Sequence, residues 1–192
     1  GPSVGKLVPR LRSTATILYA IYAALTFIEF VLLLLGGMSL FDAVTTAFAT
    51  AGTGGFGIKN SSMAEYSVYI QNVVAIFMVL FGVNFAIYFL FLIKKPKEAL
   101  KSEELRTYLG IIFISTIVIG FNIKDSFSSI WVALQQAFFQ VGSIITTTGF
   151  STVDFNTWPA LSKTIIVILM FIGGCAGSTG GGIKVSRLVV FL

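Results

Sequence analysis

The sequence predicts an all-α integral membrane protein made of two tandem units, each consisting of a helix, a re-entrant loop and a second helix. Three observations support this class: the apolar composition, the lengths of the apolar runs and a repeated loop motif. Of the 192 residues, 56% are hydrophobic and only 11% are charged. Soluble chains carry roughly 25% charged residues, so this composition indicates that much of the surface faces lipid.

Long apolar runs predict the spanning helices. Residues 14–35 form a run close to the roughly 20 residues that cross a hydrocarbon core. Further runs cover residues 68–93 and 105–121, and a fourth begins at Thr164 and is interrupted at Gly173. We therefore expect four spans.

Shorter apolar segments lie within each pair of spans. Residues 40–50 give a helix of roughly 16 Å at 1.5 Å per residue, which is about half the thickness of the core. A similar segment precedes residue 146. Segments this short must enter the membrane and return.

The basic residues predict the orientation. Three of them, Lys59, Lys124 and Lys163, lie at one set of helix ends, and the rest lie at the other set: Lys6, Arg10, Arg12, Lys94, Lys95, Lys97, Lys101, Arg106, Lys184 and Arg187. The positive-inside rule then places both termini and a solvated 94–106 linker in the cytoplasm. We expect a multi-pass protein of the cell inner membrane.

Shifting the chain on itself by 94 residues reveals an internal repeat. Residues 53–57 (TGGFG) then align with residues 147–151 (TTGFS). This divides the chain into a first repeat, residues 1–95, and a second repeat, residues 107–192, joined by the 94–106 linker. We call residues 52–57 the first loop and residues 146–152 the second loop.

Both loops are rich in Thr and Gly and follow half-helices. Non-helical backbone at membrane depth persists only where protein, water or an ion satisfies it. Rows of carbonyls and hydroxyls without a carboxylate suit a monovalent cation, which the negative helix C-termini also favour. Gly55 and Gly149 would supply unusual backbone angles, and Phe56 and Phe150 would pack outward. The alternative is two tight turns in ordinary loops.

Glycine is also concentrated in the last apolar run. Six of the ten residues from 173 to 182 are Gly, and each costs a helix roughly 1 kcal/mol relative to Ala. The helix should therefore break at a depth where broken backbone lines a water-filled path. The alternative is a close helix-packing face of small residues.

These motifs resemble the Trk/Ktr/HKT superfamily of potassium transporters, in particular the membrane subunit of bacterial Trk-type uptake systems. The resemblance rests on residues 146–152 (TTTGFST), 52–57 (GTGGFG), 40–43 (LFDA) and 173–184 (GGCAGSTGGGIK). Members of that family have four helix–pore-loop–helix (M1-P-M2) repeats around one pore, above a cytosolic nucleotide-binding regulatory subunit. The resemblance implies that this chain holds the second and third repeats, as part of a longer protein.

The resemblance also implies roles for individual residues. Potassium, the transported ion, would contact a selectivity filter made of Gly52, Thr53, Gly54, Gly55, Phe56, Thr146, Thr147, Thr148, Gly149 and Phe150. An intramembrane gate below it would consist of Gly173, Gly174, Cys175, Ala176, Gly177, Ser178, Thr179, Gly180, Gly181 and Gly182. The first loop departs from the Thr-Thr-Thr-Gly pattern of the second.

Several polar residues have two interpretations. Glu29, inside the first predicted span, either bonds to a neighbouring loop or attracts ions near the outer side. The amides Gln71, Asn72, Asn84, Gln135, Gln136 and Gln140 are expected to bond between helices or brace a filter. Cys175 is expected to be a packing residue, and Asp154 lies either at the pore mouth or in a solvated loop.

Other function classes find little support. His is absent and Cys175 is the only cysteine, so we expect no enzyme, no transition-metal site, no covalently bound cofactor and no nucleic-acid partner. Residues 52–57 match a dinucleotide fingerprint, but no strand precedes them. A secondary transporter and a non-conducting half-subunit remain as alternatives. Two repeats need either further repeats or a second copy to enclose a pore.

Overall fold

The computed structural model describes residues 4–52 and 63–173, which are helical apart from short connections. The helices in chain order are α1 (Val4–Leu35), α2 (Leu40–Ala51), α3 (Val68–Phe81), α4 (Phe85–Leu92), α5 (Pro96–Leu100), α6 (Glu103–Ile123), η2 (Lys124–Ser126), α7 (Ile130–Ile145), η3 (Phe155–Thr157) and α8 (Ala160–Phe171). The all-α prediction is confirmed for these residues.

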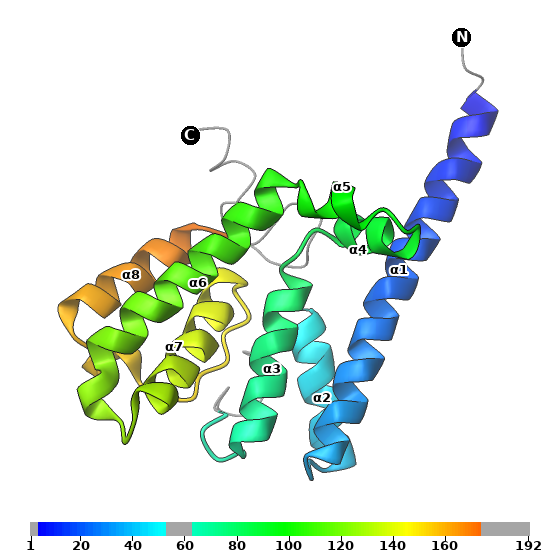
Figure 1. Cartoon of the computed structure of the whole chain (residues 1–192). Helices are drawn as coiled ribbons and strands as arrows, with labels where there is room; N and C mark the ends of the chain where they lie inside the picture. The colour runs from blue at the N-terminus through cyan, green and yellow to red at the C-terminus, as the bar shows by residue number, and fades with distance from the viewer. Residues whose placement is uncertain (1–3, 53–62, 174–192) are drawn as a thin grey trace.

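The helices form two groups of three. In the first repeat α1, α2 and α3 contact one another, and in the second repeat α6, α7 and α8 do the same (Figure 1). Helix α3 packs against α7 and so joins the two groups. Each group therefore has a short helix, α2 or α7, held between two others, as a re-entrant segment requires.

Two hydrophobic clusters fill the interior, and each includes residues of both repeats. The cluster of the first repeat also contains Phe139 of α7 and Phe150 of the second loop. The cluster of the second repeat also contains Val83, Ile87 and Ala99, which precede α6. The two groups of helices therefore share their cores.

Serine caps begin both short helices. Ser39 accepts a hydrogen bond from the Asp42 amide at 3.2 Å at the start of α2, and Ser129 accepts one from the Val132 amide at 3.3 Å at the start of α7. Such caps satisfy backbone donors that a helix leaves unpaired at its first turn. They set the points at which the two re-entrant helices begin.

In the part of the chain that the structure describes, two helices are long and apolar enough to cross a membrane, within residues 13–35 and 103–126. A third crossing is counted if α3 and α4 together make one span, although they bend by 90°. Helix α8 has 12 residues, and the described part of the chain ends two residues after it. The spans expected at 14–35 and 105–121 agree with α1 and α6.

The apolar run expected to span at residues 68–93 is not one continuous helix, because the chain breaks between α3 and α4. Gly82 ends α3, and the Asn84 side chain caps α4 by accepting a hydrogen bond from the Ala86 amide at 3.0 Å. The hydroxyl of Tyr108 donates to the Val79 carbonyl at 2.8 Å, and that of Tyr88 donates to the Leu80 carbonyl. The same two carbonyls also accept hydrogen bonds from the Gly82 and Val83 amides, so the tyrosines add a second bond to each carbonyl at the break.

The 94–106 linker is also more regular than a solvated loop. Pro96 begins the short helix α5, and Ser102 caps α6 by accepting a hydrogen bond from the Leu105 amide at 3.2 Å. Ala99 and Leu105 are buried. The basic residues of this segment are exposed, as expected of a face in water.

Candidate functional site

The second loop begins where α7 ends, at Thr146. Its backbone alternates in handedness, because Thr147 has φ 59° and Gly149 has φ 91°, whereas Thr146 and Thr148 are not left-handed. A left-handed angle is costly for a β-branched residue such as Thr, so the surrounding contacts must hold it. Alternation of this kind turns successive carbonyls toward one side, as the glycine in the motif led us to expect.

Ser143, in the last turn of α7, forms hydrogen bonds with the backbone of this loop. Its hydroxyl donates to the Phe150 carbonyl at 2.5 Å and accepts a hydrogen bond from the Gly149 amide at 3.1 Å. The Ser143 carbonyl also accepts a hydrogen bond from the Thr148 amide at 2.9 Å. One buried serine therefore fixes three consecutive residues of the loop.

The threonine hydroxyls of the loop bond within the protein. Thr146 donates to the Gly142 carbonyl at 2.6 Å, and its hydroxyl lies 2.8 Å from that of Thr148. Thr147 donates to the Thr146 carbonyl at 2.6 Å. Thr146 and Thr148 are fully buried, so these two hydroxyls pack behind the loop rather than lie open to solvent.

The carbonyls of Thr148 and Gly149 accept no hydrogen bond from any residue in the described ranges. They follow the C-terminal end of α7, where the negative pole of the helix dipole lies. Phe150 is 1% exposed and packs into the cluster of the first repeat. The arrangement offers carbonyl oxygens at a negative helix end, which is suitable for a cation without its water.

A contact between repeats lies at the Gly82 break, and sequence reasoning missed it. A side chain at Gly82 would overlap the hydroxyl of Tyr108 and lie 2.9 Å from the Cγ2 of Thr146. Gly82 thus allows the end of α3 to approach the start of the second loop. The pair Gly82 and Asn84, a helix-ending residue and a cap within an apolar run, was the available signal.

The side-chain amides predicted to bond between helices have two kinds of partner. Gln71 of α3 and Gln135 and Gln136 of α7 bond to one another, as predicted for contacts between helices. Asn84 instead caps its own helix. Asp154 is exposed, and its side chain accepts a hydrogen bond from the Asn156 amide at 3.0 Å, which supports a turn in a solvated loop.

Glu29 is fully buried, and the predicted bond to a neighbouring loop is not observed within the described part. Neither carboxyl oxygen has a hydrogen-bond partner there. The hydroxyl of Thr50 lies beside the carboxyl, but it donates its proton to the Thr46 carbonyl at 2.8 Å. The carboxyl therefore lacks a donor from α2.

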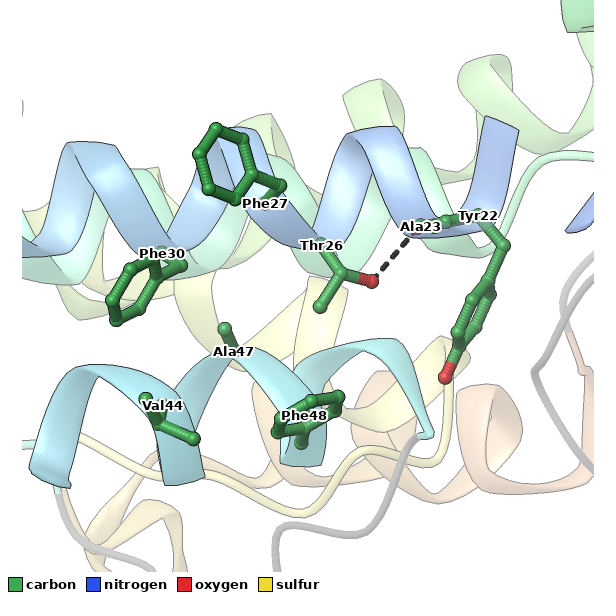
Figure 2. Close-up of a pocket in the computed structure, with 8 residues that line it drawn as sticks. All are labelled: Tyr22, Ala23, Thr26, Phe27, Phe30, Val44, Ala47 and Phe48. Atoms are coloured by element: carbon green, nitrogen blue, oxygen red, sulfur yellow. Dashed lines mark hydrogen bonds between the residues drawn. The ribbon is translucent and has the colours of Figure 1, made fainter. Parts of the chain in front are cut away.

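An apolar groove runs between α1 and α2 (Figure 2). Among the described residues that line it, Tyr22 and Thr26 are the polar ones, and the Thr26 hydroxyl donates to the Tyr22 carbonyl at 2.8 Å. Phe27, Phe30 and Phe48 supply much of the wall. The described lining is therefore largely apolar.

The structure describes only some of the other predicted site residues. Gly52 ends α2 with an ordinary helical-side φ of −87°, whereas Thr53, Gly54, Gly55 and Phe56 lie outside the described residues. Helix α8 ends at Phe171 and Gly173 is buried, which fits a break at this point. The rest of the predicted gate, Gly174, Cys175, Ala176, Gly177, Ser178, Thr179, Gly180, Gly181 and Gly182, also lies outside them.

Comparison with known proteins identifies the family. A family described as "TrkH: Cation transport protein" matches residues 3–192. The chain belongs to this family. Because its helices are apolar and the family transports cations, this TrkH-family chain is a membrane protein with M1-P-M2 repeats.

The relatives of this TrkH-family chain include several potassium uptake proteins. It is 38% identical over 191 residues to "Trk system potassium uptake protein TrkH" of Escherichia coli K12, and 32% identical over 188 residues to TrkG of the same strain. These alignments cover 96% of this chain and 39% of each relative. The chain thus spans about two fifths of the length of the curated relatives it matches.

A solved structure agrees with the fold. The crystal structure of the potassium transporter TrkH from Vibrio parahaemolyticus matches with a TM-score of 0.88 at 36% identity. The match covers 95% of this chain and 40% of that one. The two helix–pore-loop–helix units expected from the sequence are therefore confirmed.

Proposed function

We propose that this chain forms two of the repeats around a potassium-conducting pore in a longer Trk-type uptake protein. The observation that carries the proposal is the second loop, with alternating handedness at Thr147 and Gly149 and open carbonyls at the end of α7. The names of the relatives, potassium uptake proteins, support K⁺ as the transported ion. K⁺ is the cargo of this pore, and no covalent cofactor or catalytic step is needed.

The rest of the assembly follows from the same proposal. Further repeats of the longer protein, or a second copy of a half-size one, complete the four-repeat pore. The basic segment around α5 and the start of α6 faces the cytoplasm, as do both termini of this segment, in the cell inner membrane. A cytosolic nucleotide-binding regulatory subunit acts on the gate at residues 173–182.

The proposal is tested by comparing two glycines with the same backbone angle. Gly149 has φ 91° and Gly37 has φ 90°, so alanine costs a similar strain of roughly 1–2 kcal/mol at either position. Gly37 lies in the turn between α1 and α2, and a side chain there would meet nothing within 4 Å. The two substitutions therefore carry a similar backbone strain at different positions.

The measurement is K⁺ and Na⁺ flux through the full-length protein in liposomes. Gly149→Ala is expected to reduce the preference for K⁺ over Na⁺, whereas Gly37→Ala leaves the preference at the wild-type value. Equal preference in all three proteins would contradict the filter role of the second loop.

A secondary transporter is the second candidate, and the 90° break between α3 and α4 is the observation that favours it. Broken helices near the midplane hold the ions of many such transporters. Flux that requires a second ion would support this candidate, whereas single-channel currents in a planar bilayer would support the pore.

A further inference from the structure

Five side chains join the outer ends of α3 and α7 to the segments that follow the two loops. We call them the amide network: Gln71, Gln135, Gln136, Gln140 and Thr152. Gln71, Gln136, Gln140 and Thr152 are buried. Since a buried amide is costly unless it is hydrogen-bonded, the pattern of bonds in this network is strongly constrained.

Gln71 has bonds on both ends of its amide. Its Nε2 donates to the Met63 carbonyl at 3.0 Å and to the Tyr66 carbonyl at 3.2 Å. Its Oε1 accepts a hydrogen bond from Gln135 at 3.1 Å and from Gln136 at 3.4 Å. Gln71 thus connects the segment that leads out of the first loop to the second pore helix.

The same network reaches the end of the second loop. Gln136 accepts a hydrogen bond from the Thr152 hydroxyl, and Gln140 donates to the Val153 carbonyl at 3.4 Å. The Met63 amide donates directly to the Ser151 carbonyl at 2.7 Å. The two segments that leave the loops are therefore held to each other and to both helices.

This arrangement bears on selectivity, because a cation filter discriminates through the spacing and number of its oxygens. The bonds of Ser143 fix the shape of the second loop alone, whereas Gln71 fixes its position relative to the first repeat. We propose that Gln71 is a positioning residue that sets the position of the second loop relative to the first repeat and thereby the preference for K⁺ over Na⁺. The proposal rests on the pore function proposed above.

The test uses the full-length transporter in liposomes and measures the K⁺/Na⁺ flux ratio together with the total K⁺ flux. Gln71→Met keeps the length of the side chain and removes its donors and acceptor. Thr152→Val keeps the shape of the side chain and removes the bond to Gln136. The control is Asn72→Leu, because Asn72 is the next residue of α3 and its side chain makes no hydrogen bond in the described ranges.

We expect Gln71→Met to lower the K⁺/Na⁺ ratio by about fivefold, which corresponds to the loss of about one net hydrogen bond. Thr152→Val is expected to lower it less, and the double variant should fall short of the product of the two effects, since both act on one network. Asn72→Leu should keep the wild-type ratio.

Each result has a defined meaning. If the wild-type protein conducts K⁺ selectively and both Gln71→Met and Thr152→Val keep its K⁺/Na⁺ ratio, the proposed role of Gln71 is wrong. The proposed pore function is not affected by that result. A reduced K⁺ flux at an unchanged ratio also overturns the role of Gln71, because a purely structural defect has that signature. If Gln71→Met fails to fold, the ratio of Thr152→Val decides. A wild-type protein without K⁺ flux contradicts the proposed function instead.

Discussion

The two pore helices occupy equivalent places but stabilise their surroundings differently. Helix α2 has 12 residues and α7 has 16. At the 94-residue offset, Ser143 of α7 corresponds to Ala49 of α2, and Gln140 corresponds to Thr46. At both of these positions, the side chain in α7 is longer than the side chain in α2.

The polar groups of the two helices also have different partners. In α2, Thr45 and Thr50 donate to carbonyls of their own helix. In α7, Ser143 bonds to the second loop. One position acts alike in both, since Asp42 accepts a hydrogen bond from Tyr66 at 3.4 Å and Gln136 accepts one from Thr152. The two repeats share one architecture, whereas the described polar residues of their short helices have different partners.

The largest effect is expected at Gly82, where the repeats touch. Gly82→Ala would press against Tyr108 and Thr146 and should destabilise the protein by about 1–3 kcal/mol while reducing transport. Thermal unfolding of the purified full-length protein and K⁺ uptake measure the two effects. Gly110→Ala is the control, because a side chain there meets nothing within 4 Å. A wild-type melting temperature and uptake for Gly82→Ala would contradict the importance of this contact.

The next effect tests the difference between the pore helices directly. Ser143→Ala leaves the Gly149 amide and the Phe150 carbonyl without this partner, at a cost of about 1–3 kcal/mol for buried groups. We expect a lower melting temperature and a weaker K⁺/Na⁺ preference in flux assays. Ala49→Ser, the reciprocal change in α2, should affect both far less. Similar losses from the two substitutions would show that the helices brace their loops alike.

Glu29 distinguishes the first span of each repeat, because α6 has no acidic or basic residue between Thr107 and Ile123. Replacing this carboxyl, which has no bonding partner in the described residues, removes a desolvation cost of about 1 kcal/mol or more. Glu29→Leu is thus expected to raise the melting temperature, and Glu29→Gln to change it less. A fall with Glu29→Leu would indicate that the carboxyl has a stabilising partner.

The smallest effect concerns the bond between Asp42 of α2 and Tyr66, which lies just before α3. Burial, and next the charge of Asp42, raise the pKa of the Tyr66 phenol above its ordinary value of about 10. The protonated phenol therefore stabilises the fold below about pH 10, and this contribution is lost as the pH rises through the pKa of the folded state. The stability gap between wild type and Tyr66→Phe should shrink above that pH in thermal unfolding. A gap independent of pH would exclude the linkage.

Local patterns in the sequence predict the parts of this fold that depend on local physics. Run length predicts α1 and α6, and the Thr-Gly motif predicts the left-handed Gly149. The bend at Gly82 was missed because apolar residues on both sides continue the run. In addition, one of the two tyrosines that donate to carbonyls at the bend, Tyr108, lies far along the chain in α6, while the other is Tyr88. The partners of Gln71 on α7 lie 64 and 65 positions away. Such pairings depend on how α3 packs against α7, which no local spacing encodes.

The shared hydrophobic clusters have a consequence for how the protein is made. The first repeat leaves the ribosome before Phe139 and Phe150, which complete its core. Until they arrive, the apolar surface between α1, α2 and α3 must be covered by lipid or by the insertion machinery. Maturation of the first repeat therefore waits for synthesis of the second, and a translational stop between them leaves an intermediate suited to quality-control recognition.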